Sequence, residues 1–483
     1  MSNTATELAA RHGPNYKWWV TLTVMIGTLS LVVSSTIVNV AVPHIMRDFM
    51  IGHDQAQWLS TAFLAAMTLG MLLNGWCVPR FGVRNTYIGA MVLFVAASVI
   101  GGLAPRFEWL VLARAVQGLM GGLIQPLAMI VIFSVFPPGQ QGRAMGIYGM
   151  GVVLGPAVGP VIGGYLVDAV SWHWLFFAVL PACFLGIAMA RKLLEGRTAD
   201  APRPKLDVLG LVLLSYLLLA FLWAIPNSHA RGWTDPLVRM AWLSGTVALV
   251  AFVLWELRAS RPLLDLRVFR SRGFVGAFFL SMTVGITLFS STYLIPLFVQ
   301  EIQGFSAADA GSLLLPAGLG MAFMFPLAGH LTDRFAPTGI IVAGLIGFGA
   351  SAALMAASGT ASTFWALAAW ILLGRLGLGL MMPPVTAGGL RLLPKDVLSQ
   401  GAGVVNFGRQ LGGAFGVNLL SLYLERRTLA GGGHAVLSAY SRAFHETFLI
   451  MAVICVLALL PLWFMYRAEA RPQPIGPLAH DSD

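Results

Sequence analysis

The chain alternates between long apolar segments and short polar breaks over almost its whole length. A helix needs about 20 apolar residues to cross roughly 30 Å of hydrocarbon. Segments of this length predict an all-α polytopic membrane protein with fourteen transmembrane helices, at approximately 18–41, 56–78, 85–104, 109–133, 144–167, 172–190, 207–225, 236–256, 274–299, 310–331, 338–358, 362–386, 401–423 and 446–466.

The composition supports the prediction of a membrane protein. Of 483 residues, 57% are hydrophobic and 10% are charged, and the mean hydropathy is +0.79. Polar residues Met1–Asn15 precede a run long enough to remain as an anchor, so we expect no cleavable signal peptide. Each polar break is far shorter than the roughly 40 residues that a small domain needs. We therefore expect no soluble catalytic domain, no enzyme activity and no cofactor.

Basic residues are distributed unequally between the two sides of the membrane. With loops assigned alternately, 20 of the 30 Lys and Arg residues fall on the amino-terminal side, 7 on the other side and 3 inside helices. The positive-inside rule then places both termini in the cytoplasm. Topology and anionic lipid headgroups account for the net charge of +10, so no nucleic-acid partner is needed. Cys77, Cys183 and Cys455 lie in or beside apolar runs, which predicts neither disulfides nor a metal site.

Residues 149–164 carry glycines four residues apart, at Gly151, Gly155, Gly159 and Gly163. This spacing stacks them on one helical face, and such a face allows a neighbouring helix to approach closely in lipid. Prolines, which bend helices, follow two of these glycines: Pro156 and Pro160. The face has two interpretations: a surface that lets two parts of the protein close on each other, or a static helix pair.

The run from Gly155 to Gly164, G-P-x-x-G-P-x-x-G-G, resembles the antiporter signature in the fifth helix of the major facilitator superfamily. Residues 34–43 similarly resemble the first-helix signature of its fourteen-helix drug:proton antiporter branch, the EmrB/QacA-like group. That signature has an aspartate where this chain has Ser34. Residues 293–301, 304–306, 311–318 and 406–416 extend the resemblance through the second part of the chain.

The superfamily's loop motif G-x-x-x-D-R-x-G-x-R/K resembles two stretches of the chain. The first copy has Pro79 in place of the acid, with Arg80 and Arg84 retained; the second retains Asp333 and Arg334. The two arginines of the first copy either meet helix carboxyl ends or simply follow the positive-inside rule.

The two copies also indicate an internal repeat. They lie further apart than the roughly 190 residues that six helices occupy here, so two helices are inserted between the halves. The expected architecture is 6 + 2 + 6, with a six-helix bundle at 1–192, a linker with two extra helices at 193–272 and a second bundle at 273–483.

Arg114, Gln117 and Gly118 resemble the superfamily's R-x-x-Q-G motif in the fourth helix. An arginine inside an apolar helix is costly and should face a cavity or a partner. The alternative is that its side chain reaches the outer interface near Arg106 and Glu108.

A proton-coupled transporter needs a titratable group inside the membrane, yet none of the 20 acidic residues lies in the middle of a predicted helix. The remaining candidates are Glu301 beside Gln300, and His330 near Asp333; for each, the favoured alternative is a structural hydrogen-bonding group.

By resemblance, helices 1, 4, 9 and 12 should line a central cavity, with helix 13 close by. The candidate substrate contacts are Asn39, Gln125, Met129, Tyr293, Gln300, Met381, Asn406 and Arg409. Ordinary helix packing is the alternative for each. Three arginines and no carboxylate inside helices predict a positive field, which favours neutral or anionic lipophilic substrates over cations.

The resemblance implies a secondary exporter of drugs or other lipophilic compounds that works by alternating access in a bacterial inner membrane, with protons as coupling ion. We expect the glycine face of the fifth helix to let the halves close. In a Gram-negative host a periplasmic adaptor and outer-membrane channel are also implied. The alternatives are a dedicated exporter of one metabolite or lipid, and a membrane sensor that has lost transport.

Overall fold

The computed structural model describes residues 13–56, 58–197, 206–259, 262–264, 266–305, 307–358, 362–394, 397–431 and 436–469. Within these ranges every regular element is helical. The first part of the chain forms α2 (Tyr16–Asp48), α3 (His53–Ala56), α4 (Trp58–Phe81), α5 (Val83–Gly102), α6 (Phe107–Val135), η1 (Pro138–Gln140), α7 (Gln141–Ala169), α8 (Trp174–Phe177) and α9 (Leu180–Leu193).

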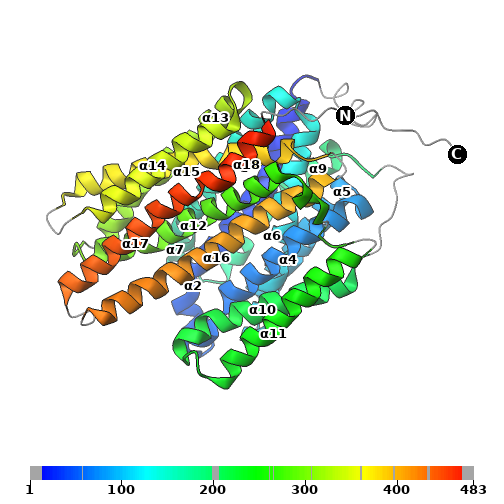
Figure 1. Ribbon diagram of the computed structural model, residues 1–483. Helices are drawn as coiled ribbons and strands as arrows, with labels where there is room; N and C mark the ends of the chain where they lie inside the picture. The colour runs from blue at the N-terminus through cyan, green and yellow to red at the C-terminus, as the bar shows by residue number, and fades with distance from the viewer. Residues whose placement is uncertain are drawn as a thin grey trace.

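A helical hairpin follows, and then a second set of long helices. The hairpin consists of α10 (Val208–Ala230) and α11 (Pro236–Arg258), and α10 contacts α4 (Figure 1). The remaining elements are η2 (Leu266–Arg270), α12 (Arg272–Glu301), α13 (Ala307–Arg334), α14 (Pro337–Ala356), α15 (Phe364–Arg391), α16 (Leu398–Ala430), α17 (Leu437–Leu457) and α18 (Leu459–Glu469).

Polar residues at the breaks start several helices. The Asp207 carboxylate accepts from Gly210 N at the start of α10, and Asp235 does the same for Leu237 N at the start of α11. These side chains satisfy main-chain donors that have no partner inside the helix. Gly82, with φ of 80°, makes the tight turn between α4 and α5.

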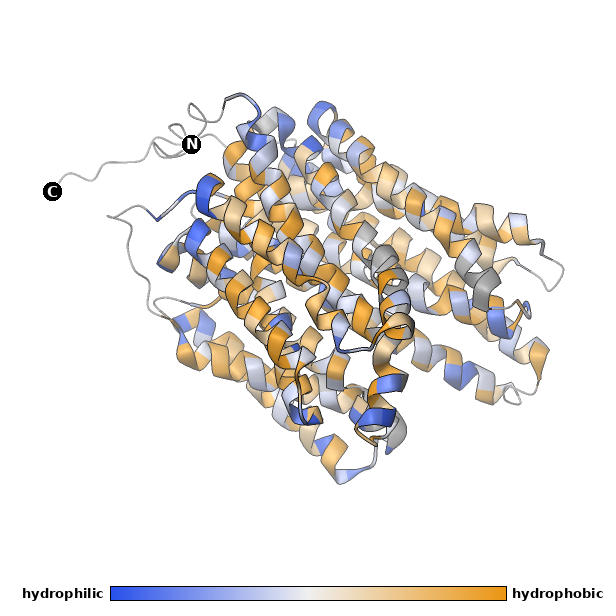
Figure 2. Cartoon of the chain, turned by 180° about the vertical axis from the view of Figure 1, so that it is seen from behind, coloured by the Kyte–Doolittle hydropathy of each residue, from blue (hydrophilic) through white to orange (hydrophobic). Residues whose placement is uncertain are grey.

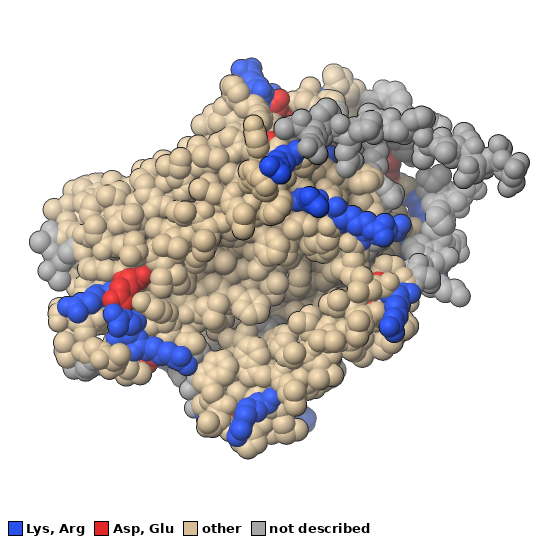
Figure 3. Space-filling view, in the orientation of Figure 1, with Lys and Arg blue, Asp and Glu red and all other residues tan. Residues whose placement is uncertain are grey.

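Twelve stretches of the described chain are long and apolar enough to cross a membrane. Apolar residues dominate the helices in Figure 2. On the face shown in Figure 3, most charged side chains gather toward the two ends and leave a broad uncharged band between them. The helices α7 and α16, which the sequence also predicts to span, are not among the twelve. One reason why α16 is not among them is that the middle of this helix is polar and includes Asn406, Arg409 and Gln410.

The long helices pack as two halves. In the first half α6 packs on α4 and α5, and α2 packs on α7; in the second half α15 packs on α13 and α14, and α12 packs on α16. The halves meet where α7 lies along α13 and where α16 lies along α4 and α6 (Figure 1). In the internal repeat that the sequence predicts, α4 would correspond to α13, and α7 to α16. The α7–α13 and α4–α16 seams would then be equivalent positions of the two repeats.

Both seams are tightest near one end of the molecule, which we call the base: the end at which α2 begins and α18 ends. A β-carbon added to Gly142 would collide with Gly329 O, and one added to Gly329 would collide with Gly142 O. At the other seam, a β-carbon on Gly75 would lie 2.8 Å from Gln400 Cγ. The two halves are thus in close contact at the base.

The glycine face of the fifth helix does not make this contact between halves. A β-carbon on Gly155 would lie 2.6 Å from Val32 Cγ1, and one on Gly151 would lie 2.8 Å from Met25 Sδ, both on α2 of the same half. Gly159 and Gly163 meet Thr36 and Ile37 of α2 in the same way. In this structure the face therefore packs within the first half, and the expectation that it lets the halves close stays a prediction.

The close approach between halves is made instead by glycines nearer the start of α7, Gly142 and Gly146. The spacing identifies a helical face but not the helix it meets. The side chains of Pro156 and Pro160 lie outside the described residues.

Candidate functional site

A small cavity of about 40 Å³ lies between the halves, where α7 of the first half approaches α13, α15 and α16 of the second. Its walls combine thioethers and aromatic rings with a few polar groups. The lining residues are Gln125, Met129, Met145, Tyr148, Gly149, Val152, Val153, Phe325, Met382, Pro383, Thr386, Asn406 and Arg409. Flexible methionine side chains can repack around differently shaped ligands.

Arg409 is the cationic group of this cavity. Its Nη2 donates to Asn406 Oδ1 at 2.6 Å. Asn406 is fully buried; its Nδ2 donates to Ala402 O at 2.9 Å and lies 3.1 Å from Met129 Sδ, across the interface between halves. The neighbouring amide therefore orients the guanidinium, while no acid among the lining residues neutralises it.

Gln125 contributes a free acceptor on the opposite wall. Its side chain is 6% exposed, and no described group donates to its Oε1. The nearby Tyr148 hydroxyl lies 3.2 Å from Thr28 Oγ1, to which it donates. A buried acceptor without a donor is costly. The cavity thus offers a cation and an unsatisfied acceptor to a ligand.

The structure brings together half of the predicted substrate contacts. Gln125, Met129, Asn406 and Arg409 line the cavity. Three others do not line it, and their assignment stays a prediction. Tyr293 is 48% exposed, the exposed Gln300 donates to Pro296 O on its own helix, and Met381 is buried beside Gly344 in the second half. The side chain of Asn39 lies outside the described residues.

Sequence reasoning missed several lining residues, among them Tyr148, Phe325 and Thr386. Tyr148 lies one residue before the glycine-rich run, and Phe325 lies four residues before Gly329 of the second loop motif. The glycine run indicates a helical face suited to close packing, and the loop motif indicates a charged turn. Neither pattern reveals that the residues just before it face the other half.

Arg114 lies inside the first half. It is 1% exposed, so its side chain does not reach the outer interface. Its Nε donates to Leu59 O at 3.2 Å, and its Nη1 donates to Ser34 O and to Gln117 Oε1 at 3.1 and 3.0 Å. The guanidinium also lies over the Phe63 ring, 4.2 Å from its centroid. In the described chain its hydrogen-bond partners are thus neutral oxygens, with no carboxylate.

The other residues of this motif hold the same helices together. Gln117 Nε2 donates to Ser98 Oγ at 2.9 Å, which links α6 to α5. A β-carbon on Gly118 would collide with Phe63 O, so α6 and α4 are in close contact there. Neither residue lines the cavity between the halves.

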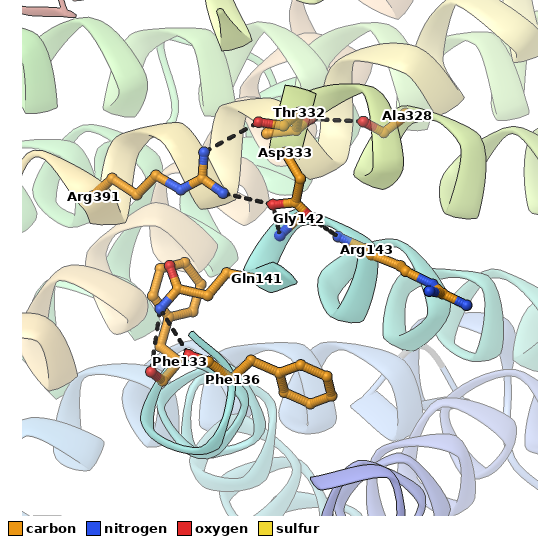
Figure 4. A network of polar contacts seen from close by, with 9 residues as sticks. All are labelled: Phe133, Phe136, Gln141, Gly142, Arg143, Ala328, Thr332, Asp333 and Arg391. Atoms are coloured by element: carbon orange, nitrogen blue, oxygen red, sulfur yellow. Dashed lines mark hydrogen bonds and ion pairs between the residues drawn. The ribbon is translucent and has the colours of Figure 1, made fainter. Parts of the chain in front are cut away.

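Asp333 links the two halves at the base (Figure 4). Its Oδ1 accepts from Gly142 N at 2.8 Å and its Oδ2 from Arg143 N at 2.7 Å, so this carboxylate of α13 caps the first turn of α7. Arg391 Nη2 forms an ion pair with Asp333 at 2.8 Å, and its Nη1 donates to Thr332 O. A negative group at a helix amino terminus is favourable. The second loop motif therefore acts as a latch across the α7–α13 seam.

Among the residues that the structure describes, the first copy of the loop motif makes no such latch. Pro79 is exposed at the position of the acid, and Arg84 lies beside Gly196 of the same half, 2.8 Å from where its β-carbon would be. The side chains of Arg80 and Arg334 are half-buried and exposed, respectively. The two seams thus differ: one has a carboxylate latch, and the other relies on packing.

The family is identified by comparison with known proteins. A model of the Major Facilitator Superfamily matches residues 24–417. Puromycin resistance protein pur8 of Streptomyces alboniger is 34% identical over 439 residues, which cover 89% of this chain and 86% of that protein. A Multidrug resistance protein B homolog of Mycobacterium tuberculosis (strain ATCC 25618 / H37Rv) is 30% identical over 397 residues, covering 81% and 73%.

Among solved structures, the proton:xylose symporter XylE matches with a TM-score of 0.67 at 15% identity, covering 93% of this chain and 95% of that one. At this identity the likeness concerns the fold alone. The family that the sequence motifs resemble is confirmed. The chain belongs to the major facilitator superfamily, and it is a multi-pass membrane transporter rather than an enzyme.

Proposed function

We propose that this protein exports lipophilic or amphipathic compounds, including drugs, across the bacterial inner membrane by alternating access. The observation that carries the proposal is the cavity between the halves, with Arg409, the free Gln125 oxygen and methionine sulfurs in its walls. In this transporter architecture a site between the halves is exposed to one side at a time as the halves rock. The names of the two resistance proteins among the relatives support export.

The proposal includes fourteen membrane-spanning helices arranged as 6 + 2 + 6. Besides the twelve stretches, α7 has 29 residues and α16 has 33, and each packs between helices of both halves. At 1.5 Å per residue, either is long enough to cross roughly 30 Å. The hairpin α10–α11 then supplies the two extra helices between the bundles at 1–192 and 273–483. The excess of basic residues on the amino-terminal side supports a base that faces the cytoplasm, as we propose.

The chemistry of the cavity favours neutral and anionic substrates. Arg409 has no acid beside it in the cavity wall, so an anionic group of the substrate would find a partner there. A lipophilic cation would instead be repelled in a site of low dielectric. The thioether and Phe325 walls would bind the apolar part of the substrate.

Proton coupling remains part of the proposal through the family resemblance. Neither Glu301 nor His330 lines the central cavity, so a proton carried by either would be linked to the substrate through movement of the halves. A periplasmic adaptor and an outer-membrane channel complete the proposal for a Gram-negative host.

The test is efflux from proteoliposomes with an imposed pH gradient, using matched lipophilic anions, neutral compounds and cations. We expect export of anions and neutral compounds. Arg409→Gln should lose the preference for anions while still moving neutral compounds, and Arg409→Lys, which keeps the charge, should retain the preference. Export of cations alone, or an unchanged preference in Arg409→Gln, would overturn the substrate assignment. If no compound moves, the protein is better described as a sensor without transport.

A further inference from the structure

A second cavity lies at the base, separate from the central one. Its volume is about 400 Å³, and both halves line it. The first half contributes Lys17, Trp18, Gly139, Gln140 and Arg143, and the second contributes His330, Asp333 and Arg334. A cavity of this size can hold a small organic ion.

The walls of this cavity carry excess positive charge. Lys17, Arg143 and Arg334 are cationic, and no carboxylate of the described residues pairs with their side chains. Lys17 Nζ donates to the neutral Gln140 Oε1 at 2.6 Å, and the Arg143 guanidinium lies 5.5 Å from the centroid of the Trp18 ring. These contacts hold the two side chains without neutralising them.

The one acid in the wall, Asp333, is already engaged. Both of its oxygens accept main-chain N–H groups of α7, and Arg391 forms an ion pair with it from outside the cavity. The charge of Asp333 is therefore balanced, while cations of both halves line the same cavity. Like charges in one site repel each other, so these cations oppose closure of the base.

We propose that this cavity binds a phosphate-bearing anion that holds the base closed. Guanidinium groups recognise phosphate through paired hydrogen bonds, and an ammonium group adds a point charge. The anion bridges Lys17 and Arg143 of one half to Arg334 of the other, so it binds the closed base better than an open one. A ligand with this difference in affinity shifts the equilibrium toward the closed base. The phosphate belongs either to a soluble molecule or to a lipid headgroup, because both present the same chemistry.

The experiment uses the full-length protein in nanodiscs of zwitterionic lipid, with inorganic pyrophosphate as the probe. Opening of the base is followed by maleimide labelling of Gln400→Cys, which lies at the α4–α16 seam outside the cavity, after Cys77, Cys183 and Cys455 are replaced by alanine. We expect pyrophosphate to slow labelling about fivefold, the lower end of typical coupling between ligands and conformations. It should also raise the unfolding temperature.

Two double variants decide the outcome. In Arg143→Gln/Arg334→Gln, pyrophosphate should change neither labelling nor unfolding temperature. In Arg191→Gln/Lys192→Gln, which removes two exposed charges from the end of α9, both effects should persist. Equal responses of the two variants, or no response of the parent protein, would overturn the proposal.

A parallel set of nanodiscs with anionic lipid identifies the source of the phosphate. If a lipid headgroup fills the cavity, labelling is already slow without pyrophosphate, and the cavity variant abolishes the difference. If a soluble anion fills it, anionic lipid alone leaves labelling unchanged, and pyrophosphate still slows it. A slowing by anionic lipid that persists in the cavity variant would count against the site.

Discussion

The Arg114 guanidinium donates from Nη1 to the main-chain oxygen of Ser34 across 3.1 Å, and the Ser34 hydroxyl lies 3.5 Å from the same nitrogen. The first-helix signature that this chain resembles has an aspartate at the position of Ser34. The fold thus places the missing acid next to the buried cation. A carboxylate introduced there would meet Arg114 directly.

Restoring the acid should create proton coupling or strengthen it. In Ser34→Asp, the carboxylate lies in the interior beside a cation, where it can exchange a proton as access alternates. We expect efflux from proteoliposomes to depend more steeply on the pH gradient than in the parent protein. The control is Ser34→Asn, which has the same shape without the charge. If the two variants respond alike, Arg114 and residue 34 do not form a coupling pair.

Removing the buried cation should destabilise the first half. Arg114→Gln removes the charged donor of three hydrogen bonds, to Leu59 O, Ser34 O and Gln117 Oε1, and a hydrogen bond to a charged group is worth about 1.5–3 kcal/mol. We expect the free energy of unfolding in detergent to fall by about 3 kcal/mol or more.

Arg375 is a matched comparison for Arg114 in the second half. Its Nη2 donates to Thr292 Oγ1, so Arg375→Gln removes the donor of one side-chain hydroxyl and should cost less than Arg114→Gln. Equal losses would show that burial of the charge, rather than the hydrogen bonds, sets the cost.

Neutralising the latch should loosen the base. Asp333→Asn keeps the shape of the side chain but removes the charge that faces the start of α7 and Arg391. The interaction of a charge with a helix end is worth up to about 2 kcal/mol, and every 1.4 kcal/mol corresponds to about tenfold in an equilibrium constant. We expect Gln400→Cys to be labelled about tenfold faster.

The control for the latch is Glu446→Gln. Glu446 forms an ion pair with Arg427 at 2.5 Å, at the opposite end of the second half. Removing this ion pair should leave labelling at the base unchanged. A similar acceleration in both variants would mean that Asp333 has no specific part in holding the base.

A glycine at the α7–α13 seam and a glycine on the α2-facing side of α7 should respond differently to an added methyl group. Gly329→Ala places a methyl group against Gly142 O across the α7–α13 seam, so it should open the base and speed labelling. Gly155→Ala crowds Val32 within the first half, so it should lower the unfolding temperature without changing labelling. Faster labelling in Gly155→Ala would support the view that the regularly spaced glycines govern closure between halves.

The apolar pattern predicted the helices well, because a membrane imposes a minimum length on every segment that crosses it. The predicted segment at 144–167 corresponds to α7, Gln141–Ala169, and the two inserted helices correspond to α10 and α11. The pattern could not show which way each helix is turned. A helix that is apolar all round carries no stripe to mark its inner face, so Tyr293 was placed in the cavity while Tyr148 was overlooked.

The R-x-x-Q-G motif predicted that Arg114 has partners inside the protein, because a charge in a membrane is costly without one. The loop motif singled out Asp333, which does bind groups of both halves. The motifs could not predict the partners. The oxygens around Arg114 come from three separate helices, and the donors to Asp333 are main-chain groups of the other half. Such contacts depend on how distant helices pack, which local spacing does not encode.

Because the two seams differ, we expect one of them to open before the other. Since Pro79 replaces the acid in the first loop motif, the α4–α16 seam has no carboxylate latch among its described residues, and it should part before the α7–α13 seam. That seam faces the flank on which α10 contacts α4. With the base facing the cytoplasm, as proposed, we expect a compound dissolved in the inner leaflet of the bilayer to enter sideways along this flank, before a path from the cytosol opens.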